Sequence, residues 1–451
     1  MNNKIILTAL AGLFLTSCGA YRKYQPVSEV SPALYGNDIE LTDTTSLATI
    51  AWQEFFTDTS LQSLIDTALM NNTDYQVAQL RTEQALASLG AAKLAYFPSL
   101  NLNADGNITR YDGLTNKTYN IGLNASWEID IFGKLTAAKR GAAAAAVSAD
   151  EQAHTVKTQL IATVATSYYS LLMLDRQIEI AESTLENWTE TIRVMELLKT
   201  AGMANEAGIL QTKANRIGLQ ADIVAMKKSR KEIENSICAM LARNPRSIPR
   251  GKIDDATFPS DLSTGLPVQL LANRPDVRDA EMELARTHYA VGVARASFYP
   301  SLTLGGTVGF TNNGGVVVNP GQWLLNAVGQ IMQPIFNRGQ IRANYKIAEA
   351  DREIALLQFN QSLINAGTEV NNALTDIESA RERINLVKEQ MELLTDAVAK
   401  TELLMRHSPT NYLEVLTAQQ SLLSAQQSEV QCRYDEIAAI ISLYHALGGG
   451  I

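Results

Sequence analysis

The sequence predicts a mainly α-helical protein with a membrane β-barrel part, in which one structural unit is present twice. Three observations support this fold class. Segments of the first half recur in the second half, two long stretches almost lack the residues that end helices, and each half contains short segments of alternating apolar and polar residues. With 451 residues, the chain is long enough for such a duplicated architecture.

The chain begins with the features of a secretory leader. Lys4 is followed by an apolar run, Ile5–Leu15, and then by small residues. The run is too short to span a bilayer, which takes roughly 20 residues. Leu15–Cys18 matches the bacterial lipobox, in which the thiol is acylated and becomes the first residue of the mature chain. We predict a lipoprotein signal peptide over residues 1–17 and lipidation of Cys18; Gly19 and Ala20, with no Asp, resemble an outer-membrane address.

Composition argues against several classes of function. The formal net charge of −9 argues against a nucleic-acid partner. Cys238 and Cys432 lie in helical patterns and are expected to be free, buried thiols. The four histidines show no ligand spacing, and no nucleophile elbow or phosphate loop occurs. We therefore predict no catalytic site, no cofactor and no metal site.

An internal repeat organises the chain. Tyr96–Leu100 recurs as Phe298–Leu302 at an offset of 202 residues, which grows to 206 further along. We expect two copies, residues 59–245 and 263–447, each consisting of a helix, two strands, a long helix, a turn and a last helix.

The strands of each copy are predicted from alternation. Tyr119–Ile131 alternates apolar and polar residues, which is typical of a half-buried strand, and Tyr111–Asn116 is expected to form the turn before it. A tilted strand needs about 9–11 residues to cross an outer membrane. The segment from Trp323 to Gln333 alternates poorly. We expect the four strands over residues 99–111, 118–132, 301–312 and 322–334.

The helices are predicted to be long. Leu135–Lys199 and Gln340–Arg406 contain no proline and one glycine each. Such lengths indicate a coiled coil, a membrane span or a helical repeat. The 3-4 spacing of apolar residues in their distal halves favours coiled-coil packing. We expect helices over residues 135–200, 206–242, 339–406 and 411–447.

Four strands per chain cannot form a membrane barrel alone, because the smallest such barrels use about eight. Open strand edges are not tolerated in lipid. The chain must therefore oligomerise if its strands span a membrane. Two copies would give eight strands and a filled lumen, and three would give twelve strands and a pore.

The motifs resemble those of one family, the TolC-like outer-membrane efflux lipoproteins that work with RND pumps. The resemblance covers the chain from Cys18 to Gly448, and its most specific segment is Leu271–Val277. The other matching segments are Tyr24–Pro26, Trp52–Asp58, Asn72–Asp74, Trp127–Lys134, Gly292–Ser301, Gln333–Gly339 and Tyr412–Gln419.

The resemblance implies a homotrimer with a twelve-stranded barrel, a twelve-helix tunnel and an equatorial belt formed by residues 18–58, 246–262 and 448–451. Its function would be that of a passive conduit that exports small molecules to the exterior of a Gram-negative bacterium. The implied partners are a periplasmic adaptor protein, an RND inner-membrane pump and outer-membrane lipid.

The resemblance also implies roles for the turns between the long helices. Adaptor contact would fall on Gly202, Met203, Ser408 and Pro409, and the gate at the periplasmic tip on Glu206, Leu413, Glu414, Thr417 and Gln420. Ser408-Pro409 replaces a usual Gly-apolar pair. Thr417 and Gln420 replace an Asp and an Arg that often form ionic locks, so the lock is weakened or is replaced by Leu413 and Glu414. Alternatively, Glu206 and Glu414 lie on solvated helix faces.

Two other functions are compatible with parts of the sequence. A lipid-anchored structural coiled-coil protein would explain the long helices and the lipobox, but not the duplicated alternating strands. An outer-membrane duct for type I protein secretion shares the conduit architecture, whereas the lipobox and Tyr24–Pro26 resemble the efflux branch. The polar strand faces have little chemical preference, so the sequence assigns no cargo and no particular pump.

Overall fold

The computed structural model describes most of the chain after the leader. The described residues are 23–27, 30–31, 34–35, 46–202, 205–259, 264–265, 267–312, 322–407 and 412–450. Contacts group the chain into two compact units. Unit 1 takes Met1–Ser28, Gln79–Gln152 and Asp276–Ser362, and unit 2 takes Glu29–Ala78, Ala153–Pro275 and Leu363–Ile451. Each unit thus combines residues from both sequence repeats.

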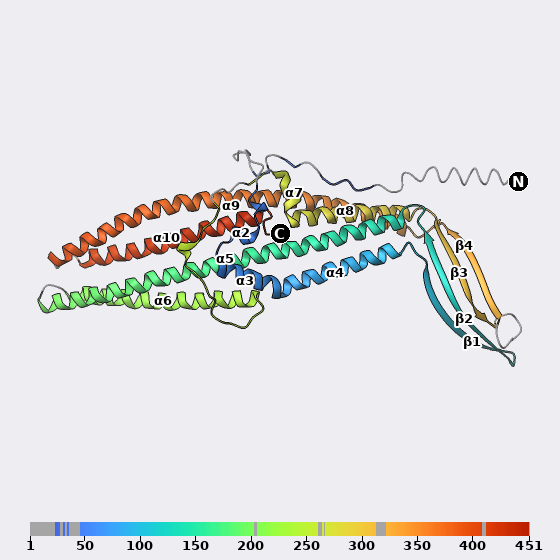
Figure 1. The fold of residues 1–451 in the computed structure, drawn as a ribbon, viewed down its shortest axis with the longest axis horizontal. Coiled ribbons are helices and arrows are strands. Elements are labelled where there is room, and N and C mark those ends of the chain that lie inside the picture. Colours follow the sequence, from blue (N-terminus) through green and yellow to red (C-terminus); the bar gives the residue numbers. More distant parts are fainter. Residues whose placement is uncertain are drawn as a thin grey trace. The chain divides into compact units, whose positions relative to one another are not determined.

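Unit 1 contains a four-stranded antiparallel sheet in the order β1-β2-β3-β4 (Figure 1). The strands are β1 (Ser99–Tyr111), β2 (Leu114–Ile129), β3 (Ser301–Thr311) and β4 (Gln322–Met332). The central pair, β2 and β3, comes from different repeats. This pairing is one reason why the units do not follow the repeats.

The first hairpin turn is tighter than the sequence prediction. The predicted turn spanned Tyr111–Asn116 and the next strand was expected from residue 118, but Tyr111 pairs directly with Leu114. Asp112 and Gly113 have φ angles of 47° and 81°, as a two-residue turn of the Asp-Gly type requires. The second strand therefore begins four residues earlier than expected.

Two strands also end two or more residues earlier than predicted. β2 stops at Ile129 rather than at residue 132, because Asp130 accepts hydrogen bonds from the backbone N–H of Leu135 (3.0 Å) and Thr136 (2.8 Å) and so caps the next helix. β4 stops at Met332 rather than at residue 334, where Pro334 has no N–H for the ladder.

The described residues form six long helices, which are α4 (Thr73–Leu94), α5 (Lys134–Thr200), α6 (Glu206–Met240), α8 (Pro275–Ala296), α9 (Gln340–His407) and α10 (Tyr412–Ala446). The shorter ones are η2 (Leu47–Thr49), α2 (Trp52–Phe55), α3 (Thr59–Asn71), η3 (Ile253–Asp255), η4 (Pro267–Gln269) and α7 (Leu270–Asn273). In unit 2, α5 runs beside α6 and α9 beside α10, as two antiparallel hairpins (Figure 1). Within the described part of the chain, none of the helices combines the length and the apolarity needed to cross a membrane.

The core of unit 2 is built along these hairpins and around the short helices. Ala181 and Trp188 of α5 pack with Leu219 and Ile223 of α6, which agrees with the 3-4 spacing in the sequence. Further along, the ring of Phe55 stacks on that of Tyr444 with a centroid distance of 4.0 Å. This packing fixes α2 and the end of α10 in one cluster.

Candidate functional site

The sheet has one continuous apolar face. Leu102 lies opposite Leu123, Leu123 opposite Val308, and Val308 opposite Leu325, so a row of apolar side chains crosses all four strands. Among the described residues nothing covers this face, since Leu102 of β1 is 74% exposed and Leu325 of β4 is 80% exposed. The exposed apolar residues are Leu100, Leu102, Ile108, Ile121, Leu123, Trp127, Leu304, Val308, Phe310, Trp323, Leu325 and Ile331.

The opposite face of the sheet is polar, because side chains alternate along each strand. Asn124 accepts a hydrogen bond from Thr307 across the central pair (2.6 Å), and Asn120 donates one to Asp105 (2.9 Å). Amides and hydroxyls dominate this face and charges are few. It could therefore line a water-filled passage without selecting strongly for one solute.

The register of β4 explains why its sequence alternates poorly. Register places Trp323, Leu325 and Ile331 on the apolar face, as the other strands require. Leu324 and Val328 then lie on the polar face beside Asn326, so both faces of β4 carry apolar residues. Pairing with β3, rather than the pattern of β4 itself, sets which way its side chains point.

The sheet is open at both edges. β1 pairs only with β2 and β4 only with β3 among the described residues. Unpaired strand edges expose backbone N–H and C=O groups, which lipid cannot hydrogen-bond. A sheet with one apolar face, one polar face and two open edges has the features expected of one segment of a larger closed wall.

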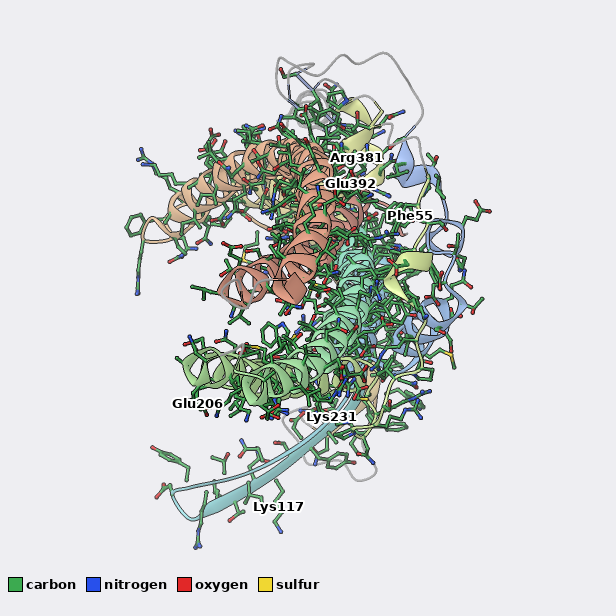
Figure 2. All side chains as sticks on the ribbon, turned by 90° about the vertical axis from the view of Figure 1, so that its left-hand side faces the viewer. Phe55, Lys117, Glu206, Lys231, Arg381 and Glu392 are labelled. Carbon is green, nitrogen blue, oxygen red and sulfur yellow. The ribbon has the colours of Figure 1, made fainter. Side chains whose placement is uncertain are left out.

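The first predicted tip turn joins α5 to α6. Gly202 adopts a positive φ of 78°, which glycine tolerates best, and Asn205 caps α6 by accepting a bond from the Gly208 N–H (2.9 Å). Glu206, at the exposed start of α6, forms an ion pair with Lys199 of the same hairpin (Figure 2). Its carboxylate is thus engaged locally.

The second predicted tip region is the start of α10. Leu413, Thr417 and Gln420 are spaced by four and three residues and share one exposed face of the helix. Glu414 is also exposed, whereas Val415 and Leu416 are buried. Four of the five predicted gate residues therefore lie within three turns of one helix, and Glu206 lies on the other hairpin. Cys18, Met203, Ser408 and Pro409 lie outside the described residues.

The structure adds polar residues that the sequence did not single out. Gln420 lies in a shallow groove with Trp188, Asn215 and Asp222 of the α5–α6 hairpin. One residue away, Gln419 donates a hydrogen bond to Glu402 of α9 (3.0 Å). These contacts join α10 to both of its neighbours near the predicted gate. Only tertiary packing brings these groups together, so no local sequence signal marks them.

An arginine holds the segment after α6 against that helix. Arg250 donates to Glu234 (2.7 Å) and to Asp175 of α5. Burial alone would raise the pKa of Glu234, but hydrogen bonds from Arg250 and Lys231 outweigh it and hold the pKa below its ordinary value. Residues 246–259 are part of the segment predicted to join an equatorial belt.

Among the described residues, no group of three or more His, Cys, Asp or Glu side chains is arranged to hold a metal ion. The site consists of a two-faced sheet with open edges and of helical hairpins that end in polar turns.

Comparisons with known proteins agree with this arrangement. A family model described as "Outer membrane efflux protein" matches twice, over residues 64–243 and 266–449. The cation efflux system protein CusC of Escherichia coli K12 is 28% identical over 455 residues, covering 99% of each chain. The solvent efflux pump outer membrane protein SrpC of Pseudomonas putida is 29% identical over 411 residues, covering 88% of this chain and 87% of SrpC. The open state of the MtrE outer membrane channel of Neisseria gonorrhoeae superimposes with a TM-score of 0.85 at 26% identity, covering 95% of this chain and 98% of MtrE.

Proposed function

The chain belongs to the outer membrane efflux protein family, and we propose that three copies of it close into one passive channel. It is an outer-membrane channel of an efflux system. The observation that best supports a trimer is that the sheet has an apolar face, a polar face and two open edges. Each copy would pair its β1 with β4 of the next copy, so that twelve strands form a barrel whose apolar face meets lipid.

The remaining parts of the chain receive roles that fit this assembly. The hairpins α5–α6 and α9–α10 of three copies would supply twelve helices for a tunnel below the barrel. Cys18 would be acylated after removal of residues 1–17 and would add a lipid anchor. The belt would use residues 18–58, 246–262 and 448–451. No step in this role is catalytic.

The proposed partners are a periplasmic adaptor and an inner-membrane pump of the RND type. Energy would come from the pump, while the adaptor meets the tip turns that contain Gly202, Met203, Ser408 and Pro409. Named relatives serve a cation efflux system and a solvent efflux pump, so family membership leaves the cargo open. The polar strand face fits this breadth, because amides and hydroxyls bind many solutes weakly.

We place the gate at the start of α10. Opening would be a population shift in which the adaptor binds better to the state with separated tips. Three copies of Glu414 around one axis would repel one another and attract cations. Leu413, Thr417 and Gln420 would face the neighbouring hairpins in the closed state, and Glu206 would stay paired with Lys199.

The test is single-channel conductance in planar bilayers, together with the crosslinked mass of the detergent-solubilised protein. Wild type should run as a trimer with small, cation-selective currents. Glu414→Ala should give less cation-selective currents, because the ring of negative charge that attracts cations to the constriction is lost. Glu392→Ala on α9 is the matched control, since it removes the same charge from an exposed site outside the predicted tip.

The outcomes separate the gate from the channel. If the protein is a conducting trimer and its currents respond equally to both substitutions, the gate does not lie at Glu414. A monomer without current would contradict the channel itself and favour a lipid-anchored coiled-coil protein.

A further inference from the structure

Positive charge is concentrated where the strands meet the helices. We define the junction collar as residues 93–98, 128–140, 293–300 and 333–346, which flank the four strands. It holds eight of the 38 Lys and Arg residues of the chain but only two of the 47 Asp and Glu residues. The collar is therefore strongly basic in a chain whose formal net charge is −9.

All four parts of the collar lie at the same end of the sheet. Antiparallel pairing places the starts of β1 and β3 beside the ends of β2 and β4, with Ser99 opposite Ser126 and Ser301 opposite Met332. The hairpin turn at Asp112 and Gly113 lies at the opposite end. If the strands span a membrane, the collar lies at one of its two surfaces.

Some collar cations are engaged within the chain. Lys134 forms an ion pair with Glu128 (2.9 Å). Lys139 lies 5.2 Å from the centre of the Tyr96 ring, and Arg295 lies 5.8 Å from that of Tyr345. The rings in these pairs belong to tyrosines, which are enriched at membrane–water interfaces.

Four other cations face solvent. Lys93, Arg338, Arg342 and Lys346 are exposed, and no acidic side chain of the described residues forms an ion pair with them. Arg342 and Lys346 are four residues apart on one face of α9, about 6 Å along its axis. Arg338 lies in the turn just before this helix. Together these three form a compact basic cluster at the end of β4.

An exposed apolar segment lies next to this cluster. Ile335 is 96% exposed and Phe336 is 86% exposed, within three residues of Arg338. Apolar side chains beside cations form the pattern that binds the boundary between headgroups and acyl chains. The apolar residues would reach the acyl chains while the cations meet the phosphates.

We propose that Arg338, Arg342 and Lys346 bind the headgroups of anionic phospholipids at the periplasmic surface of the outer membrane. Arginine suits this role because its guanidinium can bind a phosphate through two hydrogen bonds. A neighbouring copy is a poorer occupant. The opposite flank of the sheet carries Lys93 and no acidic residue over residues 93–98, so it would bring like charge to the cluster.

This inference rests on the proposed function, because the collar lies at a lipid surface only if the strands span the membrane. The test uses the full-length acylated protein in detergent, titrated with phosphatidylglycerol or with phosphatidylcholine. Native mass spectrometry counts the lipids bound. The variant is the triple substitution Arg338→Gln, Arg342→Gln and Lys346→Gln. The matched control is Arg243→Gln, Arg246→Gln and Lys388→Gln, which removes three exposed cations outside the collar.

Wild type should prefer phosphatidylglycerol, and this preference should weaken as salt is raised. The collar variant should bind phosphatidylglycerol roughly 10- to 100-fold more weakly, with phosphatidylcholine binding unchanged, while the control matches wild type. Equal loss in both variants, or no loss in the collar variant, would overturn the lipid site.

Crosslinked mass and bilayer conductance of the same samples distinguish the two proposals. If the collar variant is a conducting trimer with unchanged phosphatidylglycerol affinity, the lipid site fails and the channel stands. If wild type itself gives neither trimer nor current, the channel proposal fails.

Discussion

At the residue scale, Arg250 is a residue whose loss should destabilise the fold. Its side chain is 15% exposed and joins Glu234, which is 7% exposed, to Asp175. Arg250→Ala would leave Glu234 with Lys231 and Asp175 with Arg230 as their remaining cations, and we expect a loss of about 2 kcal/mol in the free energy of unfolding from the lost charged hydrogen bonds. Thermal unfolding in detergent, followed by circular dichroism, measures the change. Arg243→Ala, at an exposed position beyond α6, should leave the midpoint unchanged; equal losses would point to a general effect of charge.

The same cluster predicts a pH dependence. The pKa of Glu234 is lower in the folded chain than its ordinary value, so its contribution to stability is fully present above the unfolded pKa of about 4.3. That contribution disappears as the pH falls through the folded-state pKa. Wild type should therefore be more stable than Glu234→Gln at neutral pH, and the difference should shrink below about pH 4. A difference that stays constant across this range would show that Glu234 acts through packing rather than charge.

Residue spacing in the sequence predicted which site residues share one helix face. It did not predict which residues of other helices they contact. Leu413, Thr417 and Gln420 share a face because their spacing alone requires it. The groove partners of Gln420, such as Asp222, lie about two hundred residues away in sequence, and only packing of the hairpins brings them near. Arg250 was likewise missed, since neither of its carboxylate partners lies next to it in the sequence.

At the element scale, the close approach of β2 and β3 can be tested with two glycines of β3. A Cβ on Gly309 would overlap the carbonyl oxygen of Ile121 and the Cα of Gly122, whereas one on Gly305 would have its nearest neighbours 3.8 Å away. Gly309→Ala should force the strands apart and reduce the yield of crosslinked oligomer in detergent. Gly305→Ala, four residues away on the same strand, should behave like wild type. Equal behaviour of the two variants would contradict the register.

Strand positions were predictable from alternation, but their ends were set by other forces. The polar run from Thr115 to Lys117 hides the start of β2 from any hydrophobic pattern, and the Asp112-Gly113 backbone decides it instead. On β4, Leu324 and Val328 blur the alternation, so that only pairing with β3 reveals the apolar face. Pattern reasoning thus finds strands, while backbone pairing fixes their limits and register.

At the scale of the whole molecule, duplication was visible because similar side chains recur at a nearly constant offset. The grouping into two units could not be predicted from the sequence, because it depends on contacts between the repeats, such as that of Asn124 with Thr307. No local pattern encodes such a pairing. The open edges of the sheet follow from the strand order, and they lead to a prediction about assembly.

The assembly predicts crosslinks that a single chain cannot make. β1 and β4 are separated by two strands, which puts them about 14 Å apart at about 4.8 Å per strand. A disulfide needs Cα atoms within about 7 Å. The experiment starts from a variant in which Cys238 and Cys432 are replaced by serine. Asn107→Cys on β1 is then combined with one cysteine substitution at a time on β4, at alternate polar-face positions from Gln322 to Gln330. Because an intrachain bond is out of reach, every disulfide reports contact between copies.

In a closed ring of three, oxidation should give dimers and trimers on a denaturing gel and nothing larger, and one β4 position should react best because it fixes the register between copies. Either cysteine alone should give at most dimers, which provides the control. A ladder that continues beyond three copies would indicate open, head-to-tail association, and one that stops at two would indicate the eight-stranded barrel with a filled lumen.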